Sequence, residues 1–373
     1  MLEAEGRSWT RGGFAAEVQA ATMRMQALGV ASASSQPAPA WPKTGAPKGA
    51  LHTEAGLSAN LDAAIDAQGV NSGSRVLAML PLFHMGGLAI QVLPALAAGG
   101  VVRLHTRFDP SAWLNDVAGW RPTTSLLVPA VMRALIEHAD WPACDLSSLA
   151  FVNSGSQIVP LPLIEAFHRR GVPVAQVYGA TETGPVSIVL RPHEAIANAG
   201  RAGRSALGVQ VRLAANGEVL LQAPNLMRGY HRDTASAFDA DGWFHTGDLA
   251  RLHDDGFYEV VGRLKELIIS GGENIHPAEI ENLVGSLPWV AECAVVGRPD
   301  ARWGEVPVLA LVLRAGCEAD LPALQALLAD KLAGFKRPRR IEVLEALPKT
   351  ALGKVQRAQL GAALESTALP LVP

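Results

Sequence analysis

Cysteine is scarce in this sequence, with three residues in a chain of 373. Cys144, Cys293 and Cys317 lie far apart and show no spacing typical of metal ligands. The sequence therefore offers no cysteine-based metal site, and the low cysteine content fits a reducing compartment. We interpret the three residues as buried thiols and not as nucleophiles.

An excess of charge of one sign is also lacking. Lys and Arg number 32, Asp and Glu number 35, and the formal net charge is -3. Such a balance gives no general attraction to nucleic acid or to an anionic membrane, so we expect neither as a partner. The one basic cluster, 336–340, is local, and we interpret it as a solvated face.

No apolar run is long enough to cross a membrane. The longest, 88–102, contains Gln91, Pro94 and two glycines, which make it too short and too broken to span a bilayer. The first residues are acidic and polar, so no signal peptide is visible. From these absences we expect a cytoplasmic protein.

The chain is long enough for about two or three domains, with a composition ordinary for a globular protein. Short apolar runs alternate with helical patterns, and one helix is expected to begin at Pro110 behind an Asp109 N-cap. This alternation predicts an α/β layer with a largely parallel sheet. The expected strands are 76–80, 101–104, 125–128, 150–153 and 174–177.

The second half of the chain has a different pattern. Residues 201–262 contain short strands divided by Gly, Asn and Asp turns, which predict a small β-rich subdomain. After Arg263 the pattern predicts a compact α+β unit. Its elements are a first strand, a helix at 277–287, strands at 291–296 and 308–312, a helix at 321–332 and a strand at 341–344.

The stretch "TGAPKG", 44–49, has the composition of an anion-binding turn. Thr44 offers a hydroxyl, Gly45 an accessible backbone, and Lys48 a positive charge. The Ser/Thr/Gly run that would normally precede such a turn is replaced by "AWPK", 40–43. The sequence leaves open whether this is a working nucleotide site, a damaged one or no site.

The stretch "VYGATETG", 177–184, follows an expected strand and is rich in small and hydroxyl residues. Tyr178 offers a ring face for a flat base, and Gly179 would let a ligand approach the backbone. Thr181 can donate to a phosphoryl oxygen, and Glu182 can hold a hard cation. An ordinary Gly/Thr loop is the alternative.

Three later stretches also carry chemical groups. Asp248 and Arg263 fall at the ends of expected strands, where they could bind ribose and phosphate oxygens or form a structural salt bridge. Gly271 and Gly272 form a glycine turn that leads into a helix, which is equally consistent with a plain turn. Lys354 lies in a polar loop, where an isolated lysine is normally a solvent-exposed residue without a specific role.

Taken together and in this order, the four stretches from 177 onward resemble the AMP-forming acyl-CoA synthetase and adenylation superfamily. This superfamily includes aryl-CoA ligases, firefly luciferases and the adenylation domains of peptide synthetases. "LPLFHMGGL", 80–88, and "VNSGSQIVPLPL", 152–163, resemble the same family, and the resemblance covers about 44–357. It implies a large N-terminal domain followed by a small, mobile C-terminal domain.

The resemblance also implies a two-step reaction with ATP, Mg²⁺ and coenzyme A. A carboxylate attacks the α-phosphorus of ATP to give an acyl-adenylate and pyrophosphate, and a thiol then displaces AMP. Both steps depend on positioning and on charge stabilisation.

By motif, the family's roles fall on the following residues. Thr44, Gly45 and Lys48 belong to the phosphate loop, Tyr178 and Gly179 to the adenine site, Thr181 to the α-phosphate and Glu182 to Mg²⁺. Asp248 and Arg263 would bind ribose, Lys265 would be the hinge, and Gly271 and Gly272 would line the pantetheine tunnel. His84 would lie between acyl pocket and nucleotide, Ser154, Gly155 and Ser156 along the pocket wall, and Lys354 would bridge the carboxylate and the nucleotide.

The sequence departs from the family in two places. The first half of the phosphate loop, aligned with 40–43, has lost its serine, glycine and threonine, so we expect nucleotide binding to outlast catalysis. Residues 5–30 resemble the opening strand and helix of a complete synthetase, yet only 31–42 separate that helix, expected at 14–28, from the phosphate loop. We therefore expect an internal deletion that leaves sheet strands unpartnered at an exposed edge.

This interpretation divides the chain into a remnant of the N-terminal strand and helix with a linker (1–36), a truncated AMP-binding domain (37–262) and a C-terminal α+β domain (263–373). The leading hypothesis is an acyl-CoA synthetase for a fatty or related carboxylic acid. The alternatives are an adenylating enzyme that loads a carrier protein and a catalytically silent nucleotide-binding remnant. The oligomeric state stays open.

Overall fold

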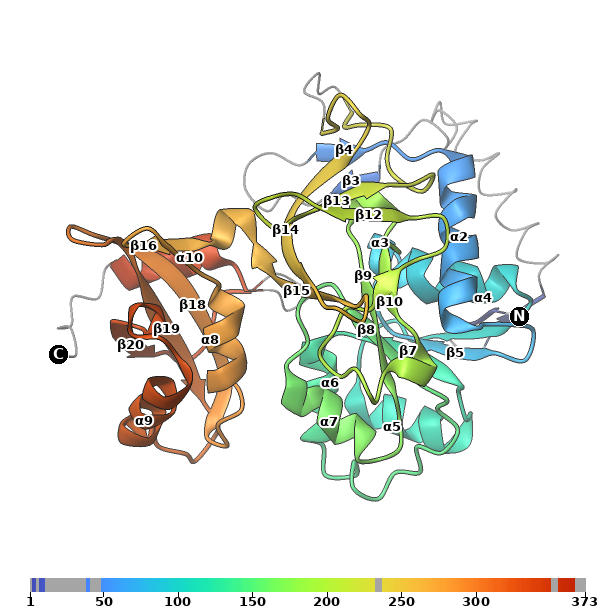
Figure 1. Cartoon of the computed structure of the whole chain (residues 1–373). Helices are drawn as coiled ribbons and strands as arrows, with labels where there is room; N and C mark the ends of the chain where they lie inside the picture. The colour runs from blue at the N-terminus through green and yellow to red at the C-terminus, as the bar shows by residue number, and fades with distance from the viewer. Residues whose placement is uncertain are drawn as a thin grey trace, which may run out of the picture.

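A central sheet of nine strands organises the large domain (Figure 1). The structure is a computed structural model, and it describes residues 2–4, 7–10, 38–40, 48–231, 237–349 and 355–365. The strands from β9 to β1 run parallel, and antiparallel strands flank them. Their order is β11 (Arg204–Ser205), β10 (Ile188–Leu190), β9 (Val174–Tyr178), β8 (Val152–Gly155), β7 (Thr124–Leu127), β5 (Arg75–Ala78), β6 (Val101–Leu104), β1 (Leu2–Ala4) and β2 (Arg7–Trp9).

Helices cover both faces of this sheet, because successive side chains of a strand point to opposite faces. On one face Leu77 packs with Trp113 and Phe167 in a core supplied by α5, α6 and α7, and on the other Val76 packs with Ala95 of α4. The helices of this domain are α2 (Glu54–Gln68), α3 (Met85–Gly87), the π-helix η2 (Leu88–Val92), α4 (Leu93–Ala97), α5 (Pro110–Gly119), α6 (Pro129–Ile136), α7 (Leu161–His168), η3 (Thr181–Thr183) and η4 (Pro192–Glu194).

Helix α5 begins where the sequence predicts. Asp109 has extended backbone and its Oδ1 accepts a hydrogen bond from the Ala112 amide at 2.8 Å, with Pro110 in the first helical position. Trp113, one turn further on, is fully buried and donates its indole N–H to Ser125 Oγ at 3.2 Å. The cap and the buried indole together fix α5 against the sheet.

A second, antiparallel sheet follows in the chain, as the turn-rich pattern after residue 201 predicts. Its strands are β12 (Gln210–Leu213), β13 (Glu218–Gln222), β14 (Phe244–Leu252) and β15 (Tyr258–Arg263). Asp248 lies inside the nine-residue β14, so its expected position at a strand end is wrong, whereas Arg263 does end β15. A hairpin of β3 (Ala38–Ala40) and β4 (Lys48–Ala50) is a separate two-stranded sheet.

The small C-terminal domain has its own sheet and its own apolar core. Its fold matches the predicted order of elements, although β18 and β19 are longer than expected and α8 stops at Val284. The elements are η5 (Leu264–Glu266), β16 (Ile268–Ser270), β17 (Glu273–Ile275), α8 (Pro277–Val284), β18 (Val290–Asp300), β19 (Gly304–Leu313), α9 (Leu321–Lys331), η6 (Gly334–Lys336), β20 (Arg340–Val343) and α10 (Arg357–Glu365).

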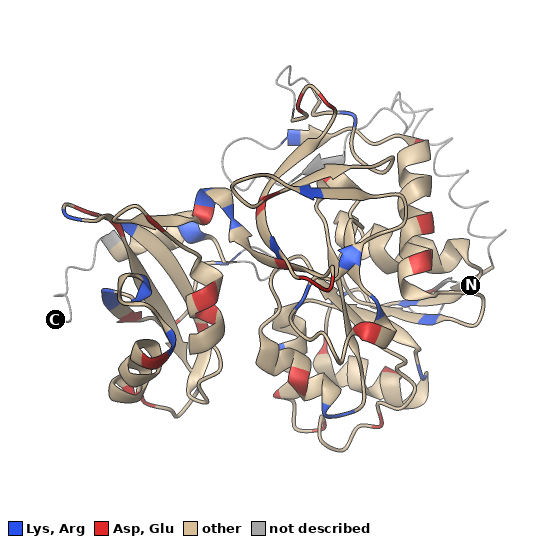
Figure 2. Ribbon diagram, viewed as in Figure 1, with Lys and Arg blue, Asp and Glu red and all other residues tan. Residues whose placement is uncertain are grey.

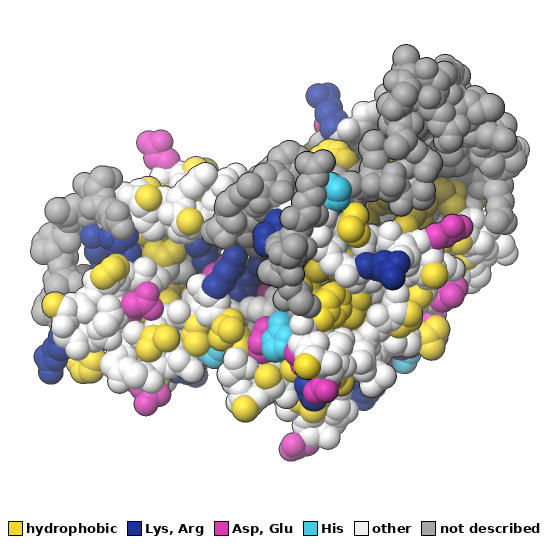
Figure 3. Space-filling view, turned by 90° about the horizontal axis from the view of Figure 1, so that it is seen from above, with side chains coloured by type: hydrophobic (Ala, Val, Ile, Leu, Met, Phe, Trp, Pro, Cys, Tyr) yellow, Lys and Arg dark blue, Asp and Glu magenta, His cyan; other side chains and the backbone are white. Residues whose placement is uncertain are grey.

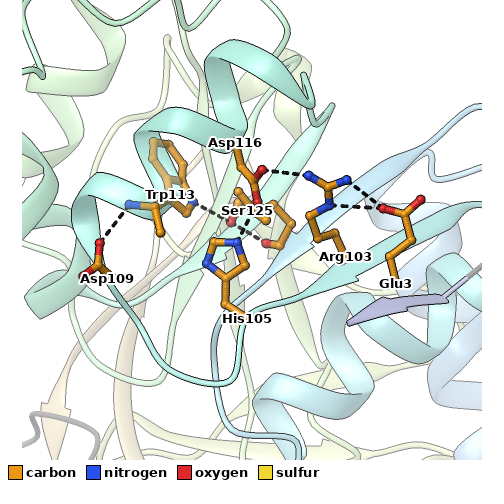
Figure 4. A network of polar contacts seen from close by, with 9 residues as sticks. Glu3, Arg103, His105, Asp109, Trp113, Asp116 and Ser125 are labelled. Atoms are coloured by element: carbon orange, nitrogen blue, oxygen red, sulfur yellow. Dashed lines mark hydrogen bonds and ion pairs between the residues drawn. The ribbon is translucent and has the colours of Figure 1, made fainter. Parts of the chain in front are cut away.

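The side of β6 that faces away from β5 is covered by β1, and the expected strand without a partner stays a prediction. β1 pairs with β6 in parallel register, with Leu2 opposite Val102. Arg103 Nε lies 3.1 Å from Glu3 Oε2, and its Nη1 lies 2.7 Å from Asp116 Oδ1 of α5 (Figure 4). His105 Nε2 contacts the other oxygen of that aspartate at 2.7 Å. The N-terminal strand is therefore held by backbone pairing and by a charged side-chain network.

Three other expectations have mixed outcomes. The strand expected at 150–153 is shifted to Val152–Gly155, because its second half is polar and gives no apolar signal. The helix expected at 14–28 lies outside the described residues. Within the described part of the chain, no helix is long and apolar enough to span a membrane.

Candidate functional site

The centre of the site is a chain of polar contacts between three strands. Tyr178 at the end of β9 donates its hydroxyl to Asp248 Oδ2 at 3.0 Å, and Arg263 Nε lies 2.9 Å from Asp248 Oδ1. The backbone also aligns the last two, since Asp248 of β14 and Arg263 of β15 are opposite each other in the ladder. Each carboxylate oxygen keeps a lone pair for a further donor.

Burial makes this arrangement electrostatically strong. Asp248 is only 7% exposed, and Arg263 provides the opposite charge that a buried carboxylate requires. Burial and the neighbouring Asp248 carboxylate raise the pKa of Tyr178 well above its ordinary value, so its hydroxyl stays a donor at neutral pH. The structural salt bridge considered from the sequence is therefore present, and the predicted role of the pair in binding ribose stays a prediction.

The loop after β8 supplies one wall of the site. Ser154 is buried, and its hydroxyl donates to the Leu127 carbonyl at 2.8 Å, which holds β8 against β7. A Cβ at Gly155 would overlap the Val177 carbonyl oxygen, so only glycine fits there. Ser156 has a φ of 69°, a left-handed conformation that non-glycine residues rarely adopt. Such strain is concentrated at functional sites and here directs Ser156 into the cavity wall.

The structure explains why residue 179 is a glycine, which the sequence did not reveal. A Cβ at this position would overlap the carbonyl oxygen of Pro185, because the loop folds back over itself. The Thr183 hydroxyl also receives the Ala180 amide at 2.8 Å within that turn. The glycine is thus required by the loop itself, and its expected role in ligand approach stays a prediction.

The 3₁₀ turn η3 presents Thr181 and Glu182 beside a segment far away in sequence. His52 Nε2 lies 2.6 Å from the Thr181 carbonyl oxygen, and the Tyr230 hydroxyl donates to Glu182 Oε1 at 2.9 Å. Burial lowers the pKa of His52 below its usual value. Sequence reasoning missed both His52 and Tyr230, because neither is close in the chain to the residue that it contacts.

Lys48 lies at the beginning of β4, next to the same tyrosine. Its Nζ is 5.0 Å from the centroid of the Tyr230 ring, within cation–π range. Ala40, the first residue of the altered loop segment, pairs with Lys48 in the β3–β4 hairpin. Thr44 and Gly45 lie outside the described residues, so their predicted roles stay predictions.

A cavity of about 350 Å³ lies between the two domains and includes the polar centre. From the large domain Tyr178, Asp248 and Arg263 line it, and from the small domain Glu281, Lys349 and Arg357. Acidic residues of α8 lie on the side of the small domain that faces the large one, as the ribbon of Figure 2 shows. Lys and Arg side chains gather along the junction seen from above (Figure 3). The site is therefore charged on both walls.

The cavity wall contains both ends of the loop that carries Lys354. Lys349 and Val355 line the cavity and form a β-bridge, and Gln356 donates its amide to the Pro348 carbonyl at 2.8 Å. Lys354 itself lies outside the described residues. Its predicted role at the site therefore stays a prediction that agrees with the position of the loop ends.

Arg357, next to this loop, joins three elements of the small domain. Its guanidinium contacts both oxygens of Glu281 in α8, at 2.6 and 3.0 Å, and Glu266 Oε2 in η5 at 3.1 Å. These two carboxylates raise the pKa of Arg357 above its ordinary value. The bidentate geometry makes this the strong form of ion pair and fixes the loop base to η5.

Eight of the described sequence-predicted residues do not line this cavity, namely Lys48, His84, Ser154, Thr181, Glu182, Lys265, Gly271 and Gly272. His84 caps α3, with its Nδ1 accepting the Gly86 amide at 3.1 Å, and Lys265 lies in η5. Gly271 and Gly272 have φ of 59° and 87° and form the tight turn between β16 and β17, where two left-handed residues are required. Their predicted roles as pocket residue, hinge and tunnel lining are not tested by these positions.

The acidic residues fit a cation that takes most of its ligands from a nucleotide. Among the described residues no group of three His, Cys, Asp or Glu side chains could hold a metal ion by itself. Mg²⁺ is usually held by one or two carboxylates together with substrate phosphates. Glu182 can supply such a carboxylate, and Tyr230, which contacts it, also contacts Lys48.

One of the three cysteines, Cys293, lines the cavity. Burial raises the pKa of Cys293 to about 12 and also raises the pKa of Cys144, so both remain thiols at neutral pH. Cys317 is exposed, and its expected burial is wrong because it lies in the turn that follows β19. Cys144 and Cys293 are half-buried.

Comparison with known families agrees with this geometry. Residues 44–231 match the model described as AMP-binding enzyme, and residues 279–354 match the AMP-binding enzyme C-terminal domain. Together these matches include Tyr178, Thr181 and Glu182 in the first region and Lys349 and Lys354 in the second.

Three relatives illustrate the similarity. The chain is 45% identical over 326 residues to an indoleacetate–CoA ligase of Aromatoleum aromaticum, covering 84% of this chain and 64% of the relative. It is 39% identical over 329 residues to a feruloyl-CoA synthase of an Amycolatopsis species, covering 85% and 67%. The o-succinylbenzoate CoA synthetase of Bacillus subtilis, solved with its acyl-adenylate, superposes with a TM-score of 0.79 at 32% identity, covering 90% of this chain and 69% of that one.

Another structure of the Bacillus subtilis enzyme holds ATP and a magnesium ion, with a TM-score of 0.76 and 33% identity, covering 85% of this chain and 68% of that one. The chain spans 64% of the length of the indoleacetate ligase, which is less than two thirds.

Proposed function

This chain belongs to the AMP-binding enzyme family, and from that premise we propose that it activates a carboxylic acid with ATP as an acyl-adenylate and transfers the acyl group to coenzyme A. The observation that carries this proposal is the Tyr178–Asp248–Arg263 arrangement inside the interdomain cavity. A buried, charge-balanced carboxylate with spare lone pairs is a good acceptor for the two ribose hydroxyls of a nucleotide.

The residues divide the reaction between them. Asp248 and Arg263 bind ribose, and Tyr178 contributes the ring face against adenine. In the first step an oxygen of the substrate carboxylate forms a bond to the α-phosphorus while the bond to pyrophosphate breaks. Thr181 and Lys354 stabilise the charge that develops there. Mg²⁺ would be held by Glu182 and would neutralise phosphate charge.

In the second step a thiolate attacks the acyl carbonyl and AMP leaves. We propose Lys265 as the pivot that turns the small domain between the steps, with Gly271 and Gly272 along the thiol's path and His84, Ser154, Gly155 and Ser156 around the acyl group. The altered segment 40–43 is proposed to weaken the phosphate loop, so that AMP binds more nearly normally than ATP. A deletion between 30 and 44 would account for the shortened match to the relatives.

We propose an aromatic carboxylic acid as the substrate in preference to a fatty acid. The relatives described above are named for indoleacetate, ferulate and o-succinylbenzoate, all of which carry an aromatic ring. A relative named for medium- and long-chain fatty acids is 36% identical over 332 residues, which is a weaker match than the 45% of the indoleacetate ligase. Loading of a carrier protein and silent nucleotide binding are the competing functions.

The test is AMP release measured with ATP, coenzyme A and a panel of indoleacetate, ferulate, o-succinylbenzoate and octanoate. We expect release with at least one aromatic acid, and its loss in Asp248→Ala. Release with octanoate alone would contradict the aromatic assignment. Nucleotide binding by calorimetry without any AMP release would instead favour the silent remnant.

A further inference from the structure

Tyr230 touches the two charged side chains that the phosphate site requires. Its hydroxyl donates to Glu182 Oε1 at 2.9 Å, and its ring centroid lies 5.0 Å from Lys48 Nζ. Tyr230 is half-buried and comes from neither the phosphate loop nor the 177–184 stretch. One side chain therefore bridges the carboxylate proposed for Mg²⁺ and the lysine proposed for the phosphates.

The backbone around Tyr230 ties the same parts together. Leu51 donates its amide to the Gly229 carbonyl at 3.0 Å, His231 donates its amide to the Gly49 carbonyl at 2.7 Å, and Tyr230 forms an antiparallel β-bridge with Ala50, the last residue of β4. The Met227 amide also donates to the Glu182 carbonyl at 2.8 Å. The end of the phosphate loop and η3 thus share one hydrogen-bonded frame, and Tyr230 lies within it.

We propose that Tyr230 is a positioning residue that fixes the Glu182 carboxylate for Mg²⁺ and the Lys48 ammonium for the nucleotide phosphates; this rests on the function proposed above. The hydroxyl occupies one oxygen of Glu182 and leaves the other for the cation, which sets the rotamer of the side chain. The ring face attracts the ammonium without neutralising it, so Lys48 keeps its charge for a phosphate.

The chain provides a matched control for this role. It contains three tyrosines, and Tyr258 of β15 donates its hydroxyl to the Val211 carbonyl at 3.4 Å, away from Glu182 and Lys48. Tyr230→Phe removes only the hydroxyl that contacts Glu182, whereas Tyr258→Phe removes a hydroxyl of similar burial elsewhere. Tyr230→Leu also removes the ring face that Lys48 contacts.

The experiment is calorimetric titration of the full chain with ATP at a series of Mg²⁺ concentrations, and with AMP in the absence of Mg²⁺. For Tyr230→Phe we expect the Mg²⁺ concentration at half-maximal ATP affinity to rise about tenfold or more, since loss of a group that orients a metal ligand costs about 10–100-fold in metal affinity. AMP affinity and melting temperature should stay within error of the parent. Tyr230→Leu should weaken ATP binding further, and Tyr258→Phe should match the parent.

Each other outcome overturns the inference. An unchanged Mg²⁺ dependence in Tyr230→Phe removes the hydroxyl from this role, even if the parent binds ATP normally and the proposed function stands. Equal loss of ATP and AMP affinity shows that Tyr230 acts on the fold and not on the metal carboxylate. A parent that binds no nucleotide at all overturns this inference and the proposed function together.

Discussion

The role of a single residue in this molecule follows from the groups that it contacts more than from its amino-acid type. Asp248, Tyr178 and Arg263 come from three strands, and each completes the hydrogen bonding of another. The sequence identified all three by resemblance. It could not identify His52 or Tyr230, because the contacts to Thr181 and Glu182 span 129 and 48 residues, and no local pattern reports such a contact.

The raised pKa of Tyr178 gives a prediction for alkaline stability. In the unfolded chain this tyrosine ionises near pH 10, whereas in the folded chain burial and Asp248 keep it protonated to higher pH. The free energy of unfolding should therefore fall as the pH rises above about 10, with a limiting slope of about 1.4 kcal/mol per pH unit from this group.

Urea unfolding of the parent and of Tyr178→Phe between pH 9 and pH 11 tests this. The variant should be less stable at neutral pH, because Asp248 loses a donor, but it should lose less stability across the alkaline range. Parallel pH profiles for the two proteins would show that Tyr178 titrates normally in the fold.

At the scale of elements, helix caps and strand order were the most predictable features. Asp109 and Pro110 start α5 where the pattern places them, and β6 has the predicted bounds 101–104. Position inside β14 was less predictable, because its residues alternate poorly between apolar and polar side chains and its register shifts between Leu249 and Ala250. Pairing of β1 with β6 was not predictable, because the paired residues of the two strands are about a hundred positions apart in the sequence.

The cap of α5 provides the second prediction. Asp109→Ala removes the acceptor for the Ala112 amide and should lower the free energy of unfolding by about 1 kcal/mol. Asp109→Asn is the matched control, because asparagine caps a helix about as well as aspartate. Chemical unfolding followed by circular dichroism measures both, and an equal loss in the two variants would mean that the charge of Asp109, and not its capping bond, stabilises α5.

At the scale of the whole molecule, the two domains face each other across a charged cavity and also touch at its side. Glu137 at the end of α6 forms an ion pair with Arg314, which follows β19 in the small domain. Arg357 meanwhile connects the loop base to η5, the segment that contains Lys265. The small domain is therefore held as one unit up to η5, so a rotation between the domains would be concentrated there.

The third prediction follows from that concentration. Lys265→Pro fixes φ within η5 and should hold the domains in one orientation, so that one half-reaction survives while the other falls by at least about tenfold. Lys265→Ala, which leaves the backbone free, should retain both half-reactions. The two are measured separately, as ATP–pyrophosphate exchange and as thioester formation from a preformed acyl-adenylate. Full retention of both by the proline variant would place the pivot elsewhere.

The pairing of β1 with β6 also has a consequence for folding during synthesis on the ribosome. Glu3 and Arg103 meet in the finished sheet, but the first of them is synthesised about a hundred residues before the second. At a typical synthesis rate of about 5–20 residues per second, the N-terminal strand is made at least several seconds before its partner. During that interval β1 can pair only with β2, so the backbone donors and acceptors that later face β6 have no partner, and such an open edge can pair with other chains. We therefore expect slower translation between residues 10 and 101 to lower the yield of soluble protein, and a cellular chaperone that binds the nascent N-terminus to restore it.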